Sequence, residues 1–326
     1  MRTHHTPDYP ETPENLAHIQ LGIPPASSAE SLLEISNKAL LGGLLVLLLI
    51  AFSWFFSQSE ALRQSLFLQS TEIAQSPLLY QAILVGLLAQ LIDGALGMAY
   101  GVSATSFLVS IGASPAAASG AVHISEIFTT AFSGVSHIKF GNVDKALFKR
   151  LVIPGVLGGI LGAYVLTSID GKLIKPFVTV YLLVMGLLIL SKAFAKKTAQ
   201  KHDVRHIKTL AVSGGFLDAV GGGGWGPIVT STLIGRGNNP RRTIGSVNTA
   251  EFFVALATGI TFLFLGTITH WVFIAGLIIG GLFAAPFAAY LTSRFTTRNL
   301  MLTVGLLITG LSIYNTYQAV LSFSTK

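Results

Sequence analysis

The sequence contains no cysteine and few charged residues. Of its 326 residues, 11% are Asp, Glu, Lys or Arg and none is Cys. The absence of cysteine excludes disulfide bonds, thiol chemistry and metal ligation by sulfur. Soluble domains carry roughly 25% charged residues. The low charge and the 51% of hydrophobic residues therefore indicate a protein whose solvent is lipid.

The sequence also lacks an ATP-binding motif and a continuous basic patch. Its net charge of +7 is spread over Lys and Arg in short gaps between apolar runs. This distribution is typical of loops that orient membrane helices and not of a nucleic-acid interface. We expect no nucleic-acid partner, and any transport must be driven by gradients and not by nucleotide hydrolysis.

The N-terminal part differs from the rest of the chain. Residues 1–38 are polar and proline-rich, and we expect a cytoplasmic tail. The uncharged run 39–56 is long enough to cross a bilayer, and no cleavage-like site follows it, so it is not a signal peptide. Residues 39–76 are interpreted as an extra transmembrane helix with its linker. Whether this helix mediates a homodimer is left open.

One stretch occurs twice. Asp93 begins DGALGMAYGVSATSFL and Asp218 begins DAVGGGGWGPIVTSTL, aligned without a gap at an offset of 125 residues. Each copy has an acidic residue, a glycine run with one aromatic residue, and a hydroxyl pair. Such internal similarity is typical of transporters built from two repeats. Further identities at the same offset are Gly112/Gly237, Pro115/Pro240, Gly120/Gly245, Glu126/Glu251 and Gly134/Gly259.

We expect an all-α, polytopic membrane protein with two repeats, at 77–206 and 207–326. In each repeat, a segment broken by glycine precedes three spanning helices. The arms around the second glycine run have roughly 11 and 9 residues and reach about 15 Å each, half of the hydrocarbon core. Each broken segment should therefore form a hairpin that turns at mid-depth. The spanning helices are expected at about 115–137, 150–167 and 173–194, and at about 240–264, 271–292 and 299–320.

The basic residues agree with hairpins. With a cytoplasmic N-terminus, this topology places most of the 21 Lys and Arg on the cytoplasmic side, as the positive-inside rule requires. Each repeat then crosses the membrane an odd number of times, so the two repeats have inverted topology. The prediction is a multi-pass protein of the cell (cytoplasmic) membrane whose two hairpins enter from opposite faces and meet near the midplane.

The glycine runs predict a binding site for a small inorganic or organic anion. Amide groups freed at the start of a half-helix attract anions, and such starts are expected near Val102 and Pro227. The alternative is that the glycines only allow close helix packing. The predicted substrate-binding residues of the hairpins are Gly97, Tyr100, Gly101, Ser103, Thr105, Ser106, Gly222, Gly224, Trp225, Gly226, Thr230 and Ser231.

Four carboxyl groups are expected within the lipid bilayer: Asp93, Glu126, Asp218 and Glu251. Intramembrane carboxyl groups are rare and usually functional. Asp93 and Asp218 either cap the glycine turns or take up a proton. Glu126 and Glu251 are candidates to carry a coupling proton, with a structural hydrogen bond or cation binding as alternatives.

His123 and Asn248 stand at equivalent positions, each three residues before one of the glutamates and on the same helical face. We expect both to line the binding site as hydrogen-bond donors. A metal site is disfavoured, because His123 and Glu126 are only two ligands and Asn248 replaces a second histidine. No metal or other cofactor is expected.

Two segments of the second repeat resemble a known family. The run GGGGWGP at 221–227 and the segment NNPRRTIGSVNTAEF at 238–252 are similar to the sulfite exporter TauE/SafE permease family, over residues 77–320. In repeat one, the glycine run is reduced to GALGMAYG. The resemblance implies a transporter of the cytoplasmic membrane, and not an enzyme, that exports sulfite or organosulfonates.

These observations lead to one hypothesis and three rivals. The hypothesis is a proton-coupled secondary transporter that works by alternating access of the two repeats. The first rival is a cation transporter or channel that uses the four carboxyl groups. The others are an intramembrane aspartyl protease, for which no motif is present, and an accessory protein without transport activity.

Overall fold

The computed structural model describes residues 76–194, 206–294 and 297–324. The chain divides into two units, Met1–Glu72 and Ile73–Lys326, and every described residue belongs to the second. The predicted cytoplasmic tail and extra transmembrane helix lie outside the described residues.

Within the described ranges the fold is all-α, as predicted, and the order of elements is the same in both repeats. The three long helices predicted for each repeat are confirmed. The elements of the first repeat are α4 (Pro77–Leu96), α5 (Tyr100–Ser110), α6 (Pro115–Lys139), α7 (Lys145–Ser168) and α8 (Gly171–Phe194). Those of the second are α9 (Ile207–Gly221), the π-helix η1 (Gly226–Thr230), α10 (Ser231–Gly235), α11 (Pro240–Phe264), α12 (Trp271–Arg294) and α13 (Thr297–Ser324).

The helices α6 and α11 begin in the same way. Each has proline in its first turn, where the missing N–H group is no loss. The hydroxyl of Ser114 accepts from the amide of Ala117, and the side chain of Asn239 accepts from the amide of Arg242. The same local signals therefore start the equivalent helix in both repeats.

The outer surface suits lipid. Among the described residues, four stretches are long and apolar enough to cross a membrane: Pro77–Gly94, Lys145–Ser168, Gly171–Phe194 and Pro240–Phe264. Large apolar side chains are exposed on them, including Phe177 at 72% and Phe264 at 79%. Exposure of this extent is what a bilayer would cover, and the chain has the features of a polytopic membrane protein.

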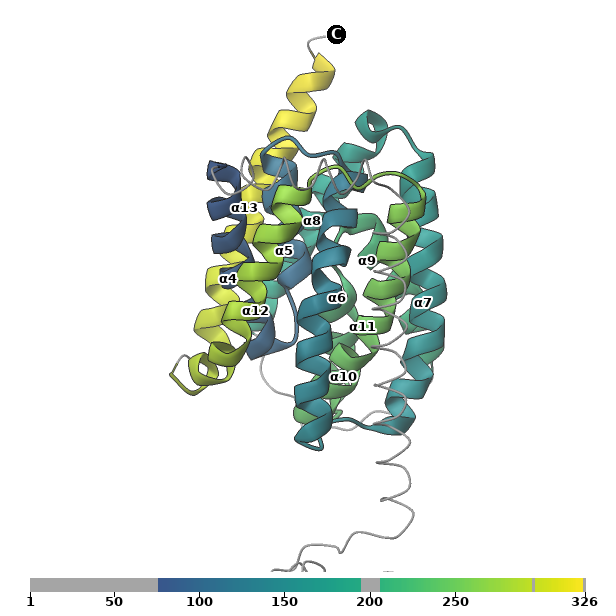
Figure 1. Cartoon of the computed structure of the whole chain (residues 1–326), viewed down its shortest axis with the longest axis vertical. Coiled ribbons are helices and arrows are strands. Elements are labelled where there is room, and N and C mark those ends of the chain that lie inside the picture. Colours follow the sequence, from purple (N-terminus) through teal and green to yellow (C-terminus); the bar gives the residue numbers. More distant parts are fainter. Residues whose placement is uncertain (1–75, 195–205, 295–296, 325–326) are drawn as a thin grey trace, which may run out of the picture. The chain divides into compact units, whose positions relative to one another are not determined.

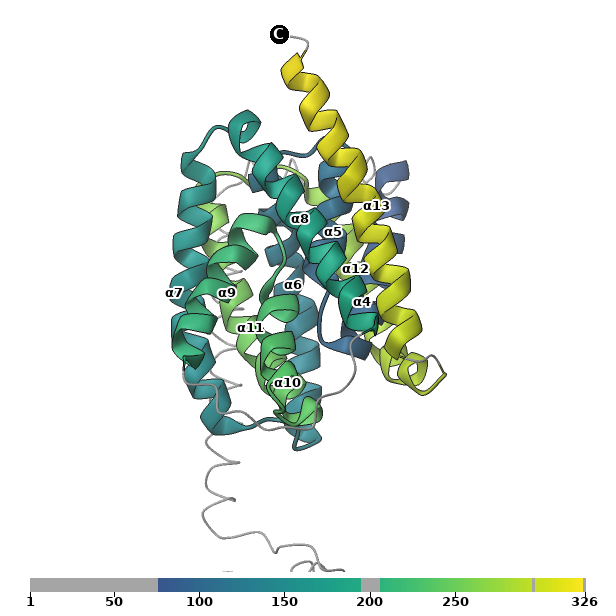
Figure 2. The ribbon, with the colours of Figure 1, turned by 180° about the vertical axis from the view of Figure 1, so that it is seen from behind.

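The two glycine runs form the turns of two hairpins. In Figure 1, α4 runs down into the bundle and α5 returns toward the end at which α4 begins; we call this pair hairpin one. In Figure 2, α9 rises from the lower end of the bundle, opposite the end at which α4 begins. The segment formed by η1 and α10 returns to this lower end, and we call α9, η1 and α10 hairpin two.

The first arms of these hairpins, α4 and α9, are longer than half the thickness of the hydrocarbon core of a bilayer. The 20 residues of α4 and the 15 of α9 correspond to about 30 and 22 Å of helix. The prediction of two short arms in hairpin two is wrong for α9, because Asp218–Gly221 still belongs to the helix. The second arm of hairpin one, α5, has 11 residues.

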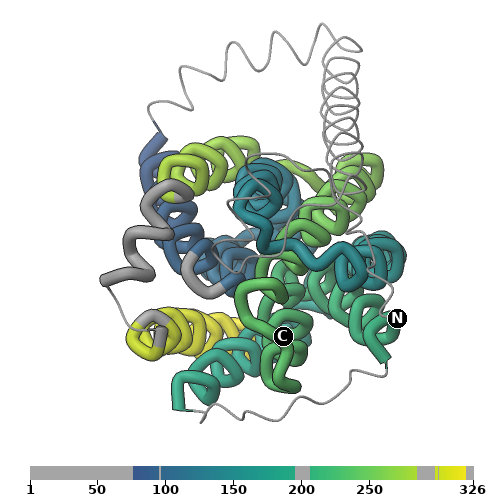
Figure 3. The backbone as a smooth tube through the Cα atoms, turned by 90° about the horizontal axis from the view of Figure 1, so that it is seen from below, coloured from purple at the N-terminus to yellow at the C-terminus, as the bar shows by residue number. Residues whose placement is uncertain are grey.

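Helices from the two repeats pack against each other in matched pairs. α4 lies against α12, and α9 lies against α7, so the first helix of each repeat packs on the second of the three spanning helices of the other. α6 lies against α11 and α8 against α13, which is visible when the helices are seen end-on in Figure 3. The two repeats are therefore interlocked within one compact unit.

Glycine allows the closest of these contacts. A Cβ atom added to Gly215 on α9 would lie 2.2 Å from the carbonyl oxygen of Gly155 on α7. One added to Gly280 on α12 would lie 2.0 Å from the carbonyl oxygen of Ile83 on α4. At both places the helix backbones touch, as is common in membrane bundles.

We expect Gly215→Ala to lower the free energy of unfolding by about 1–3 kcal/mol, because the methyl group must separate α9 from α7. Gly310→Ala on α13 is the control, since an added Cβ meets nothing within 4 Å there. Thermal unfolding of the purified protein in detergent measures both. Equal melting temperatures for the two variants would contradict the close packing of α7 and α9.

Candidate functional site

The turns of the two hairpins touch in the interior. Gly97 and Gly222 end α4 and α9 at equivalent positions, each with a left-handed φ of +66° that glycine adopts without strain. A Cβ atom added to Gly101 would lie 2.7 Å from the Cα atom of Gly223. The backbones of the two glycine runs are therefore in direct contact.

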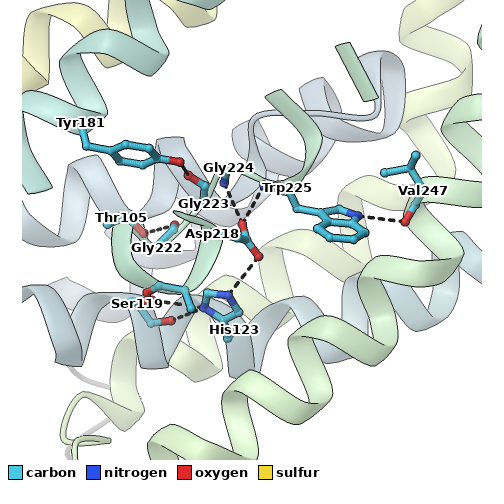
Figure 4. A network of polar contacts seen from close by, with 11 residues as sticks. Thr105, Ser119, His123, Tyr181, Asp218, Gly222, Gly223, Gly224, Trp225 and Val247 are labelled. Carbon is cyan, nitrogen blue, oxygen red and sulfur yellow. Dashed lines mark hydrogen bonds and ion pairs between the residues drawn. The ribbon is translucent and has the colours of Figure 1, made fainter. Parts of the chain in front are cut away.

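Asp218 holds the turn of hairpin two together. Its backbone carbonyl accepts from the amides of Gly222 and Gly223. Its Oδ1 atom accepts from the amides of Gly224, at 2.7 Å, and Trp225, at 2.9 Å (Figure 4). All four amides of the turn donate to this one residue. In this conformation they are therefore not free to hold an anion, as the sequence had suggested for Gly222 and Gly224.

Hairpin one has a different turn. The carbonyl of Asp93 accepts from the amide of Gly97 at 2.5 Å, as the equivalent atoms of hairpin two do. Ala99 then has a φ of +99°, which is uncommon for a residue with a side chain. The reduced glycine run of repeat one thus leaves a strained turn. The second arms begin at Tyr100 and Gly226, within two residues of the predicted starts.

His123 connects α6 to hairpin two. Its Nδ1 atom lies 2.8 Å from the carbonyl oxygen of Ser119, and its Nε2 atom lies 3.2 Å from Oδ2 of Asp218 (Figure 4). The hydroxyl of Ser119 donates to the carbonyl of Ala219 at 2.6 Å. Two neighbouring side chains of α6 therefore bind the end of α9.

The predicted carboxyl groups form one buried cluster. His123, Glu126 and Asp218 each offer one polar atom, and these three atoms lie within 4.8 Å of one another. Asp93 and Glu251 are close enough to interact electrostatically with Glu126. Within the described ranges, Oε2 of Glu126 is buried without a hydrogen-bond partner. All four predicted carboxyl groups therefore contribute to one electrostatic cluster.

The two predicted aromatic residues anchor the hairpins. The hydroxyl of Tyr100 donates to the carbonyl of Leu277 on α12, and the indole N–H of Trp225 donates to the carbonyl of Val247 on α11, both at 3.2 Å. Both rings are buried. Their polar atoms are engaged in packing the hairpins and are not available to a ligand here.

Two of the predicted hydroxyl groups link one hairpin to the other. The hydroxyl of Thr105 in hairpin one donates to the carbonyl of Gly222 in hairpin two. Ser231 in hairpin two contacts the sulfur of Met98 in hairpin one at 3.6 Å. A Cβ atom added to Gly226 would lie 2.7 Å from the Cα atom of Met98, so Gly226 is also part of this contact.

Three other predicted hydroxyl groups have no hydrogen-bond partner among the described residues. The side-chain oxygens of Ser103, Ser106 and Thr230 are buried and form no hydrogen bond with any residue that the structure describes. Buried polar atoms are nearly always paired. These three, on α5 and η1, are the members of the predicted hairpin set with unused capacity to bind a ligand.

Asn248, the counterpart of His123, has different surroundings at its amide nitrogen and at its amide oxygen. Its amide nitrogen donates to the hydroxyl of Ser133 at 3.1 Å. Its Oδ1 atom is buried and has no partner within the described part of the chain. Asn248 therefore joins α11 to α6, and it retains one acceptor for a proton-bearing group.

Two residues of α8 that were not predicted from the sequence contact hairpin two. The hydroxyl of Tyr181 donates to the carbonyl of Gly223 at 2.9 Å, and the ammonium group of Lys192 donates to the carbonyl of Pro227 at 2.8 Å. Lys192 lies in the last turn of α8. The signal in the sequence that could have identified Lys192 is its position within an apolar run.

These hairpins lie within a segment that matches a known family. The sequence model of the sulfite exporter TauE/SafE family matches residues 82–315. The chain belongs to this family. It is also 46% identical over 230 residues to the probable membrane transporter protein YtnM of Bacillus subtilis (strain 168), covering 68% of this chain and 77% of that protein. No solved structure matches the chain. As a member of the TauE/SafE family, the chain is a membrane transporter.

The role of Asp218 can be tested by two substitutions. Asp218→Ala leaves the amides of Gly224 and Trp225 without an acceptor, and we expect it to lower the free energy of unfolding by about 2–4 kcal/mol. Asp218→Asn keeps an oxygen at Oδ1 and is expected to retain most of the stability. Thermal unfolding in detergent compares them. A stable Asp218→Ala variant would show that the carboxyl group does not hold the turn.

Proposed function

We propose that this protein exports a small sulfur-containing anion, sulfite or an organosulfonate, as a secondary transporter of the cell membrane. Membership of the TauE/SafE family supports this function. The structural observation that carries the proposal is the contact of two glycine hairpins whose arms bear buried hydroxyl groups without a partner among the described residues. Hydroxyl groups without a partner are ready donors for an oxyanion.

The proposal includes inverted repeats and alternating access. It is supported by the entry of the two hairpins from opposite ends of the bundle (Figures 1 and 2) and by the exchange of helix partners between the repeats. Transporters of this architecture bind substrate between broken helices at mid-depth. Access would alternate as the contact between the two glycine turns opens toward one side or the other.

We place the basic end of the bundle in the cytoplasm. The α6–α7 and α10–α11 connections lie at the same end, the lower one in Figure 1. The positive-inside rule favours this end as cytoplasmic. Around these connections lie Lys139, Lys145, Lys149, Arg150, Arg236, Arg241 and Arg242.

The anion would first meet hydroxyl groups and not the turn amides. Within the part of the chain that the structure describes, Ser103, Ser106 and Thr230 have no hydrogen-bond partner and can donate, whereas the amides of hairpin two are held by Asp218. The ammonium group of Lys192, bound to hairpin two, supplies positive charge nearby. The rest of the predicted set would contribute only if the turns separate.

Proton coupling follows from the charges around this site. The cluster of Asp93, Glu126, Asp218 and Glu251 would repel an anion if it were fully ionised. An anion and a proton therefore favour each other's binding, and by linkage each raises the affinity for the other. We propose that the anion and the proton cross together, outward when the outward electrochemical gradient of the anion exceeds the inward gradient of the proton.

Proteoliposomes test the transport activity. We expect uptake of sulfite, or of a small sulfonate, that increases when an inwardly directed pH gradient is imposed. Sulfate and thiosulfate serve as comparison anions. Anion uptake that does not change with the pH gradient would contradict proton coupling. A cation-dependent current that Glu251→Gln abolishes, with anion binding intact, would instead establish the rival cation transporter.

The hydroxyl groups can be tested with equivalent positions of the two hairpins. Thr230→Val removes a hydroxyl without a partner in the described ranges, and we expect affinity for the transported anion to fall about 10–100-fold, with little change in melting temperature. Thr105→Val removes a hydroxyl that bonds the other hairpin, and it should lower the melting temperature. Calorimetric titration and thermal unfolding measure these effects. Unchanged affinity in Thr230→Val would place the anion elsewhere.

A further inference from the structure

We propose that His123 and Asp218 share one proton, and that this proton fastens hairpin two to α6. In the transport cycle it would be the proton that crosses with the anion, so that part of the inference rests on the proposed function. The link between the proton and hairpin two does not depend on the identity of the substrate.

The hydrogen-bond partners of His123 determine where its protons lie. Nδ1 lies 2.8 Å from the carbonyl oxygen of Ser119, which can only accept. The hydroxyl of Ser119, 3.3 Å from Nδ1, already donates its hydrogen to the carbonyl of Ala219 and can also only accept from the ring. Nδ1 therefore carries a hydrogen in this structure.

The second contact then requires one more proton. In a neutral imidazole whose Nδ1 is protonated, Nε2 has a lone pair, and a carboxylate oxygen has only lone pairs. Nε2 of His123 and Oδ2 of Asp218 are 3.2 Å apart, so without a shared proton two lone pairs would face each other in a buried site. The contact is a hydrogen bond only when His123 is charged or Asp218 is protonated.

Asp218 links the presence of this proton to the turn of hairpin two. One of its oxygens binds Gly224 and Trp225 in the turn, and the other binds His123 (Figure 4). Loss of the proton breaks the bond to His123 and leaves a charged carboxylate on the residue that holds the turn. The turn of hairpin two is then released from α6 at this point, while the Ser119–Ala219 bond remains.

Glu126 lies close enough to accept the departing proton. One of its polar atoms lies within 4.8 Å of those of His123 and Asp218, and its Oε2 has no partner in the described ranges. The pair takes up one proton from the solution on one side, and Glu126 receives it on the way to the other side. Only N–H and O–H bonds form and break, and one proton crosses.

The surroundings isolate this pair. The ring of Phe262 packs on that of His123 with centroids 5.9 Å apart, and both members of the pair are at most 2% exposed. The equivalent of His123 in repeat two, Asn248, cannot titrate, so we infer one such centre per chain. The other titratable groups that interact electrostatically with Asp218, or with Glu126 beside it, are Asp93 of α4, Tyr100 of α5, Tyr181 of α8 and Glu251 of α11.

Fluorescence tests the link without any substrate. Trp225 is bonded through its amide to Asp218, and Trp54→Phe with Trp271→Phe leaves it as the sole tryptophan. We expect its emission in detergent to change in one step as the pH is varied. His123→Gln places a permanent amide donor near the Nε2 position, so the step should disappear. His270→Gln, at the start of α12, should keep it.

Each outcome of this titration decides the inference. A step that persists in His123→Gln, or no step in the single-tryptophan parent, would overturn it. If His123→Gln fails to unfold cooperatively on heating, Asp218→Asn replaces it, because its side chain can donate to Nε2 without a titrating proton. A step retained in Asp218→Asn would equally overturn the inference.

Transport separates this inference from the proposed function. For each variant the ratio of sulfite uptake with and without an imposed pH gradient is measured in proteoliposomes. The ratio should fall to about one in His123→Gln and stay at the parent value in His270→Gln. A parent-like ratio in His123→Gln would show that the coupling proton lies elsewhere. If the parent transports no sulfur anion, the proposed function fails, and the fluorescence titration still decides the link to hairpin two.

Discussion

The structure depends on the requirement that polypeptide backbone inside a membrane finds its hydrogen bonds within the protein. At the turn of hairpin two, a single carboxyl group meets this requirement. Asp218 binds four consecutive amides through its carbonyl and Oδ1 atoms, which lets the chain reverse direction among apolar helices. Its remaining oxygen is then available for His123.

Because Gly101 and Gly223 stand where the two turns meet, the hairpins can touch backbone to backbone, and each becomes part of the other's surroundings. The bond from Thr105 to the carbonyl of Gly222 and the contact of Ser231 with Met98 cross this boundary in opposite directions. The helices behind the turns are interlocked in the same way, because α4 packs on α12 and α9 on α7. A displacement of one hairpin must therefore change the contacts of the other, as a transport cycle requires.

The predicted site residues separate into two groups once the contacts are known. Tyr100, Trp225 and Thr105 hold the hairpins in place, whereas Ser106 and Thr230 keep unused hydrogen-bonding capacity. Sequence position does not distinguish the groups, since Thr105 and Thr230 are equivalent in the repeat. The difference arises because the two turns are not identical and meet asymmetrically.

The sequence alone determined the helical segments, the membrane class, the family and the two glycine turns. These depend on local composition, proline at the first turn of α6 and α11, and a repeat visible at fixed spacing. Only the tertiary structure decided that Asp218 caps its turn, that His123 of one repeat bonds the hairpin of the other, and that Lys192 of α8 reaches Pro227. The cap is local, and the sequence left the role of Asp218 open between a cap and a proton carrier. The contacts of His123 and Lys192 join residues 95 and 35 positions apart in the chain, and no local pattern encodes which donor a freed carbonyl or carboxylate will meet.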